Sequence, residues 1–202
     1  MIVLFIRLTF WQQLHGDYDH IGDAINLLNE IKVDEVLFNN DSFNDNENKI
    51  IKVLDKKNIK YSKNSWDFKK IEDLYFLNTK MYDNENDNSN VIYTELDGYK
   101  FIFMADAGID KEKDILDKYN ISGIDVLKIG HHGSKTSSSK YFINEIKPKY
   151  SIISVGENNR YGHPNNEVLK NLANSKIYRT DLDGSIVFRI KNDKLKIETC
   201  AP

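Results

Sequence analysis

The stretch LHGDYDHIGD, residues 14–23, places two histidines and three acidic residues in ten positions. Directly after it, apolar residues recur at helical spacing, which predicts an amphipathic helix over 21–31. His15, Asp17, Asp19 and His20 offer imidazole and carboxylate groups from one tight turn. Imidazole is the commonest metal ligand in proteins, and carboxylate accompanies it in hard, hydrolytic sites. This stretch therefore predicts a turn that serves one metal ion or two adjacent ions.

A second interpretation of the same turn stays open. Asp19 could be the N-cap of the following helix, with the histidines as surface residues. If metal ions bind instead, two ions about 3.5–4 Å apart would suit phosphodiester hydrolysis, because such a pair clamps the attacking and leaving oxygens.

The other histidines also lie where predicted strands end. His131 and His132 follow an apolar strand expected over 124–130, and His163 follows one expected over 150–156. Asp106 ends a strand as well; a lone acid there is more often a turn residue unless other ligands converge. Since imidazoles and carboxylates recur at several strand ends, we expect a dinuclear metal site.

Composition limits the alternatives. The chain has 202 residues with 28 Lys and Arg against 31 Asp and Glu, so we expect one domain over 1–202 and no broad basic surface. Any contact with nucleic acid must then be local. Cys200 is the only cysteine, which excludes a disulfide framework and a cysteine zinc site.

The N-terminal segment MIVLFIRLTF is too short for a membrane span and is interrupted by Arg7, so it predicts a buried strand. No other segment approaches the roughly 20 apolar residues that a span needs. The expectation is a chain that is soluble as given and cytoplasmic by default.

Strands and helices alternate along the chain, which predicts an α/β fold with sheets covered by helices. A hairpin is expected to turn at Asp97 and Gly98, and a final hairpin at 183–184. The expected strands are 33–38, a strand near 58–62, 124–130, 150–156 and 176–180; the expected helices are 47–57, 110–119, 138–146 and 165–173.

Over about residues 12–202 the motifs resemble a known family. They are HxDxDH, the strand-end Asp106, VLKIGHHGSKTSSS, PKYSIISVGENNRYGHP and YRTDLDGSI, in that order. Together they are similar to the metallo-β-lactamase-like domain of ComEC-type competence proteins. The resemblance implies an αββα sandwich and a metal-dependent hydrolase that cleaves DNA phosphodiester bonds, with the strand not taken up during transformation as its target.

The resemblance also implies a ligand set for two divalent ions, Mn²⁺ or Zn²⁺. His15 and Asp17 would hold one ion, Asp19 and His20 the other, and Asp106 would bridge them. His132 would be a further ligand, and His131 would either support the ligands from outside or face the substrate. Asp17 stands where many members of the superfamily have histidine, which favours Mn²⁺ somewhat. A third histidine of the first site has no counterpart, and Asn88 or Ser89 is the nearest match.

Roles in the reaction follow from the same resemblance. Asp19 would orient or deprotonate the attacking water. His163 would donate a proton to the leaving oxygen or contact a phosphate, or it would only cap a helix begun at Pro164. The residues expected to bind phosphate are Ser134, Lys135, Thr136, Ser137, Asn159 and Arg160. For the serine run, a solvated loop leading into a helix stays the alternative.

Only fourteen residues precede His15, fewer than the family places there. We therefore expect an incomplete first sheet with an open edge, as in an N-terminally truncated product, half of a split protein, or a derivative that forms a homodimer over the gap. Expected partners are DNA and a membrane channel of the competence system, since the parent family is membrane-anchored. An inactive remnant that serves as an interaction module, or a hydrolase of another ester or lactam, remain the alternative functions.

Overall fold

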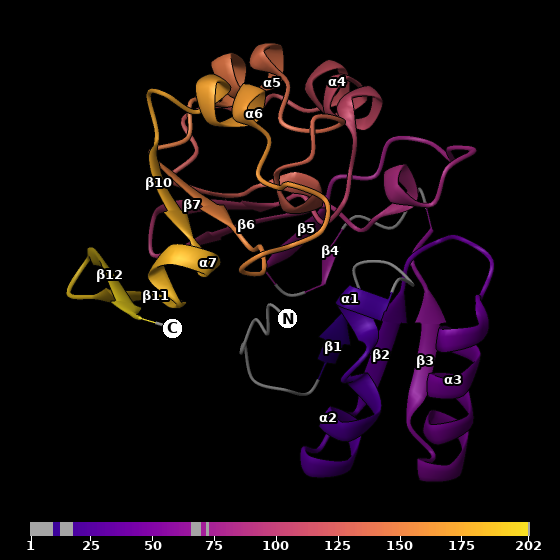
Figure 1. The fold of residues 1–202 in the computed structure, drawn as a ribbon. Coiled ribbons are helices and arrows are strands. Elements are labelled where there is room, and N and C mark those ends of the chain that lie inside the picture. The colour runs from indigo at the N-terminus through magenta and orange to yellow at the C-terminus, as the bar shows by residue number, and fades with distance from the viewer. Residues whose placement is uncertain (1–9, 13–17, 66–69, 72, 202) are drawn as a thin grey trace.

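A computed structural model describes residues 10–12, 18–65, 70–71 and 73–201, and Figure 1 shows its fold. Two β-sheets form the centre of the molecule. The first has three parallel strands, in the order β1-β2-β3, with bounds Phe10–Gln12, Glu35–Phe38 and Lys60–Lys63. Helices α2 (Ala24–Glu30) and α3 (Asp45–Lys57) accompany this sheet.

The second sheet has seven strands in the order β10-β9-β8-β7-β6-β5-β4. Neighbours from β7 to β10 pair in parallel, and those from β4 to β7 pair antiparallel. The strands are β4 Lys70–Ile71, β5 Leu74–Phe76, β6 Ile92–Leu96, β7 Tyr99–Phe103, β8 Val126–Lys128, β9 Tyr150–Ile153 and β10 Lys176–Arg179. Helices α4 (Ile109–Lys118), α5 (Lys140–Ile146) and α6 (Asn166–Asn171) lie together at the top of Figure 1.

Side-chain alternation along β2 shows how the layers are built. Val36 and Phe38 pack with Leu28 of α2 and Leu54 of α3 in one buried cluster. Leu37, which points to the opposite face, packs instead with residues of β5 and β6 of the second sheet. The two sheets therefore face each other with helices outside, which is the predicted αββα sandwich.

The larger core lies between the second sheet and its helices. It includes Ile102 of β7, Leu127 of β8, Ile115 of α4 and Phe142 of α5. Burying a side chain of this kind contributes about 1.5–3 kcal/mol relative to leaving it exposed. This core fixes the strands whose ends carry the predicted site residues.

The predicted helix over 21–31 is wrong in its extent. The chain forms α1 (Tyr18–Ile21), breaks at Gly22 and Asp23, and resumes as α2. Glycine is a weak helix former because it loses the most backbone entropy, so the break falls there. Asp19 lies inside α1 rather than before it, so the prediction that it is the helix N-cap is also wrong.

The predicted turn of the last hairpin is wrong as well. Strands β11 (Ser185–Lys191) and β12 (Lys194–Cys200) turn at Asn192 and Asp193, with φ of 53° and 56°. Two successive positive φ values match a type I′ turn, which Asn and Asp tolerate. Asp183 instead ends helix α7 (Thr180–Asp183), where its carboxylate accepts a hydrogen bond from the backbone N–H of Arg179. The turn at Asp97 and Gly98 is confirmed.

In the described part of the chain the first sheet has three strands and the second has seven, and the expected open edge of the first sheet stays a prediction. Most of MIVLFIRLTF lies outside the described residues; its last residue, Phe10, begins β1. No helix of the described residues is long and apolar enough to cross a membrane.

Candidate metal centre

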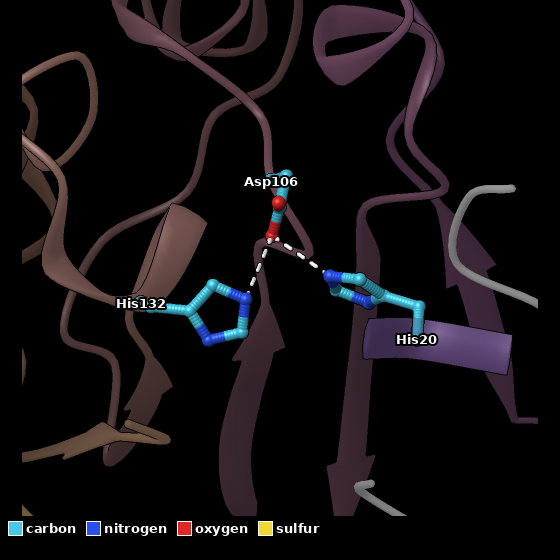
Figure 2. Close-up of side chains that lie close together, drawn as sticks. All are labelled: His20, Asp106 and His132. Carbon is cyan, nitrogen blue, oxygen red and sulfur yellow. Dashed lines mark ion pairs between the residues drawn. The ribbon is translucent and has the colours of Figure 1, made fainter. Parts of the chain in front are cut away.

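Three side chains from distant parts of the sequence converge at one point (Figure 2). They are His20, Asp106 and His132, and each offers a ligand atom within 4.8 Å of the others. His20 Nε2 lies 3.1 Å from Asp106 Oδ1, and His132 Nε2 lies 3.9 Å from the same oxygen. Asp106 is therefore the common neighbour of both imidazoles.

His20 comes from the N-terminal half, where α1 carries it. Ile21 and Ala24, just beyond it, are buried against the core of the first layer. This packing anchors α1 and directs His20 towards the second layer, where Asp106 lies. Among the described residues, His20 is therefore the side chain that the first layer adds to Asp106 and His132.

Asp106 lies in a tight loop between β7 and α4 and is only 3% exposed. Its backbone N–H donates to Ser89 Oγ, at 3.4 Å. The preceding Ala105 has φ of 50°, a left-handed conformation that costs an L-residue roughly 1–2 kcal/mol. Strain of this kind concentrates at functional sites, where surrounding contacts hold it in place.

His132 lies in the short 3-10 helix η2 (Gly130–Gly133), where His131 and His132 have φ of 46° and 53°. The His131 backbone N–H donates to the carbonyl of Ala105, at 2.9 Å, and ties this loop to the Asp106 loop. His132 Nδ1 lies 2.7 Å from the carbonyl of Ser154. A carbonyl only accepts, so Nδ1 carries the proton and Nε2 presents its lone pair on the side of Asp106.

This donor set fits a divalent metal ion. Two imidazole nitrogens and a buried carboxylate are ordinary ligands for Zn²⁺ and Mn²⁺, and a carbonyl partner on the second ring nitrogen is the usual support for a ligating histidine. His15 and Asp17 lie outside the described residues, as does the side chain of Asp19. A second ion held by those residues stays a prediction.

Buried charges behind the site were missed from the sequence. Lys128 in β8 is buried and donates to the carbonyl of Ile129, at 2.9 Å. Burial lowers the pKa of Lys128 to about 8, although the negative charge of Asp106 opposes that shift. The sequence signal for this buried charge is the lysine inside the apolar strand VLKIG.

Lys111 and Glu112, on α4, fix two loops near the site. The Lys111 ammonium donates to the carbonyls of Asp87 and Ser89, at 2.8 and 2.7 Å. The Glu112 carboxylate accepts hydrogen bonds from the backbone N–H groups of Ser138 and Ser139. Burial raises the pKa of Glu112 to about 7, and those N–H groups partly offset the shift.

His131 and His163 lie beside the group and are partly exposed. His131 Nε2 is 3.8 Å from Asp106 Oδ2, and its ring centroid is 6.1 Å from that of His163. Partial burial lowers the pKa of His163, and the nearby His131 and His132 lower it further. The alternative that His163 caps a helix is wrong: α6 begins at Asn166, and the Asn165 side chain accepts from Glu167 N–H as its cap.

The predicted phosphate-binding residues occupy two kinds of position. Lys135, Thr136 and Arg160 are exposed. Ser134 and Ser137 are buried, and Ser137 Oγ donates to the carbonyls of Gly130 and Ser134, so it shapes the loop itself. Asn159 closes its own loop by accepting from His163 N–H and donating to the His163 carbonyl.

Asn88 and Ser89, the nearest matches to the missing histidine, also have structural partners. The Asn88 side chain donates to Asp41 Oδ2 and to the carbonyl of Tyr82, which links the two halves of the molecule. Ser89 Oγ accepts from Asp106 N–H. Ser89 therefore stands beside the candidate ligand Asp106, whereas the Asn88 side chain bonds to Asp41 and Tyr82.

Comparison with known proteins agrees with this architecture. The family described as "Metallo-beta-lactamase superfamily" matches residues 15–157. ComE operon protein 3 of Bacillus subtilis (strain 168) is 34% identical over 186 residues, covering 88% of this chain and 24% of the relative. Competence protein ComA of Neisseria gonorrhoeae is 34% identical over 133 residues, covering 62% of this chain and 19% of the relative.

Recombination protein 2 of Haemophilus influenzae (strain ATCC 51907 / DSM 11121 / KW20 / Rd) is 32% identical over 116 residues, covering 56% of this chain and 14% of the relative. The chain thus spans a quarter or less of the length of these relatives. The matched family, the sandwich and the resemblance to ComEC-type proteins agree with one another, and the chain belongs to the metallo-β-lactamase superfamily.

Proposed function

We propose that this chain is a metal-dependent phosphodiesterase that cleaves DNA in connection with DNA uptake. The observation that carries the proposal is the meeting of His20, Asp106 and His132 from three separate segments. Family membership supports hydrolysis with divalent metal, and the names of the similar competence proteins support DNA as the substrate. A channel partner of the competence system would then deliver the strand.

His20, Asp106 and His132 would hold the ion, with His15, Asp17 and Asp19 as further predicted ligands. When bound, a divalent ion supplies Lewis-acid chemistry that activates water and offsets charge developing on the phosphoryl group. Asp106 brings a negative charge into a buried setting, and the Lys128 ammonium behind it partly balances that charge. The Ser154 carbonyl holds the His132 ring so that Nε2 keeps its lone pair for the ion.

Proton transfer would fall to residues on either side of the ion. Asp19 would orient or deprotonate the attacking water. His163 would donate a proton to the leaving oxygen, or else contact a phosphate. The pKa of His163 lies below its ordinary value, so a smaller fraction of it is protonated at neutral pH and this donation would improve as pH falls.

The test is incubation of purified protein with linear DNA and Mn²⁺ or Zn²⁺, beside Asp106→Ala and His132→Ala. We expect the wild type to degrade DNA and both variants to fall to background. Asp117→Ala is the matched control, because Asp117 is an exposed carboxylate on α4. A wild type that leaves DNA intact, or variants that cleave equally well, would overturn the proposal.

Metal analysis distinguishes the alternatives. A folded protein that binds no ion indicates the inactive remnant. A protein that binds the ion and hydrolyses model esters or lactams while leaving DNA intact indicates another substrate for the same scaffold.

A further inference from the structure

Tyr161 is exposed beside the candidate metal centre although it is a large aromatic residue. Its exposed fraction is 67%, in the loop between β9 and α6 that also carries His163. A single exposed tyrosine is ordinary on a protein surface. Tyr161 differs because its ring stacks on that of His163, which links it to the candidate site.

The rings of Tyr161, His163 and His131 form a row that leads from the surface to Asp106. The Tyr161 and His163 rings are stacked, with centroids 5.8 Å apart and an interplanar angle of 20°. The next step, from His163 to His131, is 6.1 Å, and His131 Nε2 is 3.8 Å from Asp106 Oδ2. The outer end of this ring row is thus two rings away from the group that would hold the ion.

The loop that carries the outer rings is fixed before any ligand arrives. Asn159 accepts from His163 N–H at 2.9 Å and donates to the His163 carbonyl at 2.7 Å. The Asn165 N–H donates to the carbonyl of Gly133, at 2.8 Å, which joins this loop to the one that carries His132. A surface built this way loses little entropy on binding.

Positive charge accompanies the exposed ring. Arg160 Nη2 donates to Tyr161 Oη at 2.6 Å, and the guanidinium carbon lies 4.8 Å from the ring centroid. Lys135 is also exposed, on the loop that follows His132. The chain as a whole has a net charge of −3, so this cationic and aromatic pairing is a local feature.

We propose that Tyr161, with Arg160 beside it, stacks the base of an unpaired nucleotide that flanks the scissile phosphate, so that the site selects single-stranded DNA. The inference rests on the proposed function. Stacking on an aromatic ring needs the open face of a base, which a base inside a duplex does not offer. The guanidinium meets the adjoining phosphate through its planar fork of N–H donors.

Binding measured without metal tests this separately from cleavage. A short oligothymidylate carrying 2-aminopurine is titrated with protein in EDTA, and fluorescence quenching reports stacking. Tyr161→Ala is expected to bind about 5- to 150-fold more weakly than the wild type, the range that loss of one stacked base gives. Tyr161→Trp is expected to keep or improve the affinity, because it keeps an aromatic face.

Two controls make the effect specific. Tyr141, on α5, is 58% exposed, so Tyr141→Ala removes an equally exposed tyrosine and should leave binding unchanged. A fully paired duplex of the same length should bind more weakly than the single strand and lose little in Tyr161→Ala. In Mn²⁺, the same variant should raise KM for the single strand more than it lowers kcat.

The outcomes separate the two proposals. If the wild type cleaves DNA while Tyr161→Ala binds and cleaves single strands as well as the wild type, the stacking inference fails alone. Equal losses on single strand and duplex overturn it too. A wild type that neither binds nor cleaves DNA removes the proposed function together with this inference.

Discussion

The two layers of the sandwich contribute to the candidate site in different ways. In the described residues the first layer supplies His20 from the four-residue helix α1. The second layer supplies Asp106, His131, His132 and His163 from loops after β7, β8 and β9. Buried Lys111 and Glu112 hold loops of the second layer in place, and these contacts accompany left-handed backbone at Ala105, His131 and His132. The second layer is thus a preformed platform, and the first layer completes it.

Two buried glutamates show the difference at the level of single residues. Glu47 and Glu112 each lie in the first turn of a helix and are each only 1% exposed. Glu47 accepts from the backbone N–H of Asn44 in a capping box, so it serves its own helix. Glu112 reaches a loop 26 and 27 residues further along the chain. In these contacts Glu47 acts on the start of its own helix, whereas Glu112 acts on a distant loop.

The largest expected effect comes from Asp106→Asn, where the layers meet. The amide keeps the size of the carboxylate but removes its charge, so the ion loses its only anionic ligand among His20, Asp106 and His132. After dialysis against Mn²⁺ or Zn²⁺, elemental analysis should find the ion in the wild type and almost none in the variant. Asp117→Asn should bind as the wild type does. Retention of the ion by folded Asp106→Asn would show that the ligands lie elsewhere.

The pH dependence of stability should trace to Glu112 in the second layer. Its folded pKa of about 7 lies above the ordinary glutamate value of 4.5, so the folded state binds the proton more tightly. The contribution of this group to the free energy of unfolding is fully present below the unfolded pKa. It is lost as pH rises through about 7, and the loss is up to about 3 kcal/mol. Urea unfolding of the protein in EDTA at pH 5 and pH 7 measures it.

Glu112→Gln should flatten that pH dependence, since the amide does not titrate. Glu145→Gln, at an exposed glutamate of α5, is the matched control. A slope that persists in Glu112→Gln would assign it to another group.

The contact between the two site loops should depend on Gly133. A Cβ added there would lie 2.7 Å from Pro164 Cβ, and φ of +82° already disfavours a side chain. Overpacking typically costs about 1–3 kcal/mol, so Gly133→Ala should lower stability by that amount beyond its backbone strain. Gly98→Ala is the matched control, because Gly98 has φ of +78° with nothing within 4 Å of the added Cβ. Equal losses in urea unfolding would show that the loops do not press together.

The smallest expected effect lies in the first layer. Replacing Asn44 with Ala removes the capping side chain that accepts from Asn46 and Glu47 N–H, at a cost of about 1 kcal/mol. Thermal unfolding followed by circular dichroism measures it, and metal content should not change. A loss of bound ion in this variant would mean that helix α3 of the first layer influences the site, which the contact of His20 with Asp106 does not indicate.

Much of the fold could be predicted because it depends on local chemistry. Short apolar runs predict the strands, and Asp97 with Gly98 predicts a hairpin turn that the structure has. The predicted turn at 183–184 was wrong because Asp-Gly suits a helix end as well as a hairpin. Asp183 ends a helix instead, and its carboxylate accepts a hydrogen bond from the backbone N–H of Arg179. The helix over 21–31 was wrong because one glycine outweighed the apolar spacing around it.

The sequence by itself determined which chemistry is present: histidines and an acid at strand ends, in an order that indicates the superfamily. Only the tertiary structure decided that His20 meets Asp106 across the layers, at 3.1 Å, and that Glu112 fixes a distant loop. It also decided that Tyr161 remains in solvent while Lys128 is buried. The physical reason is that spacing along a chain encodes periodic faces and turns, whereas contacts between distant segments follow from how complete layers pack.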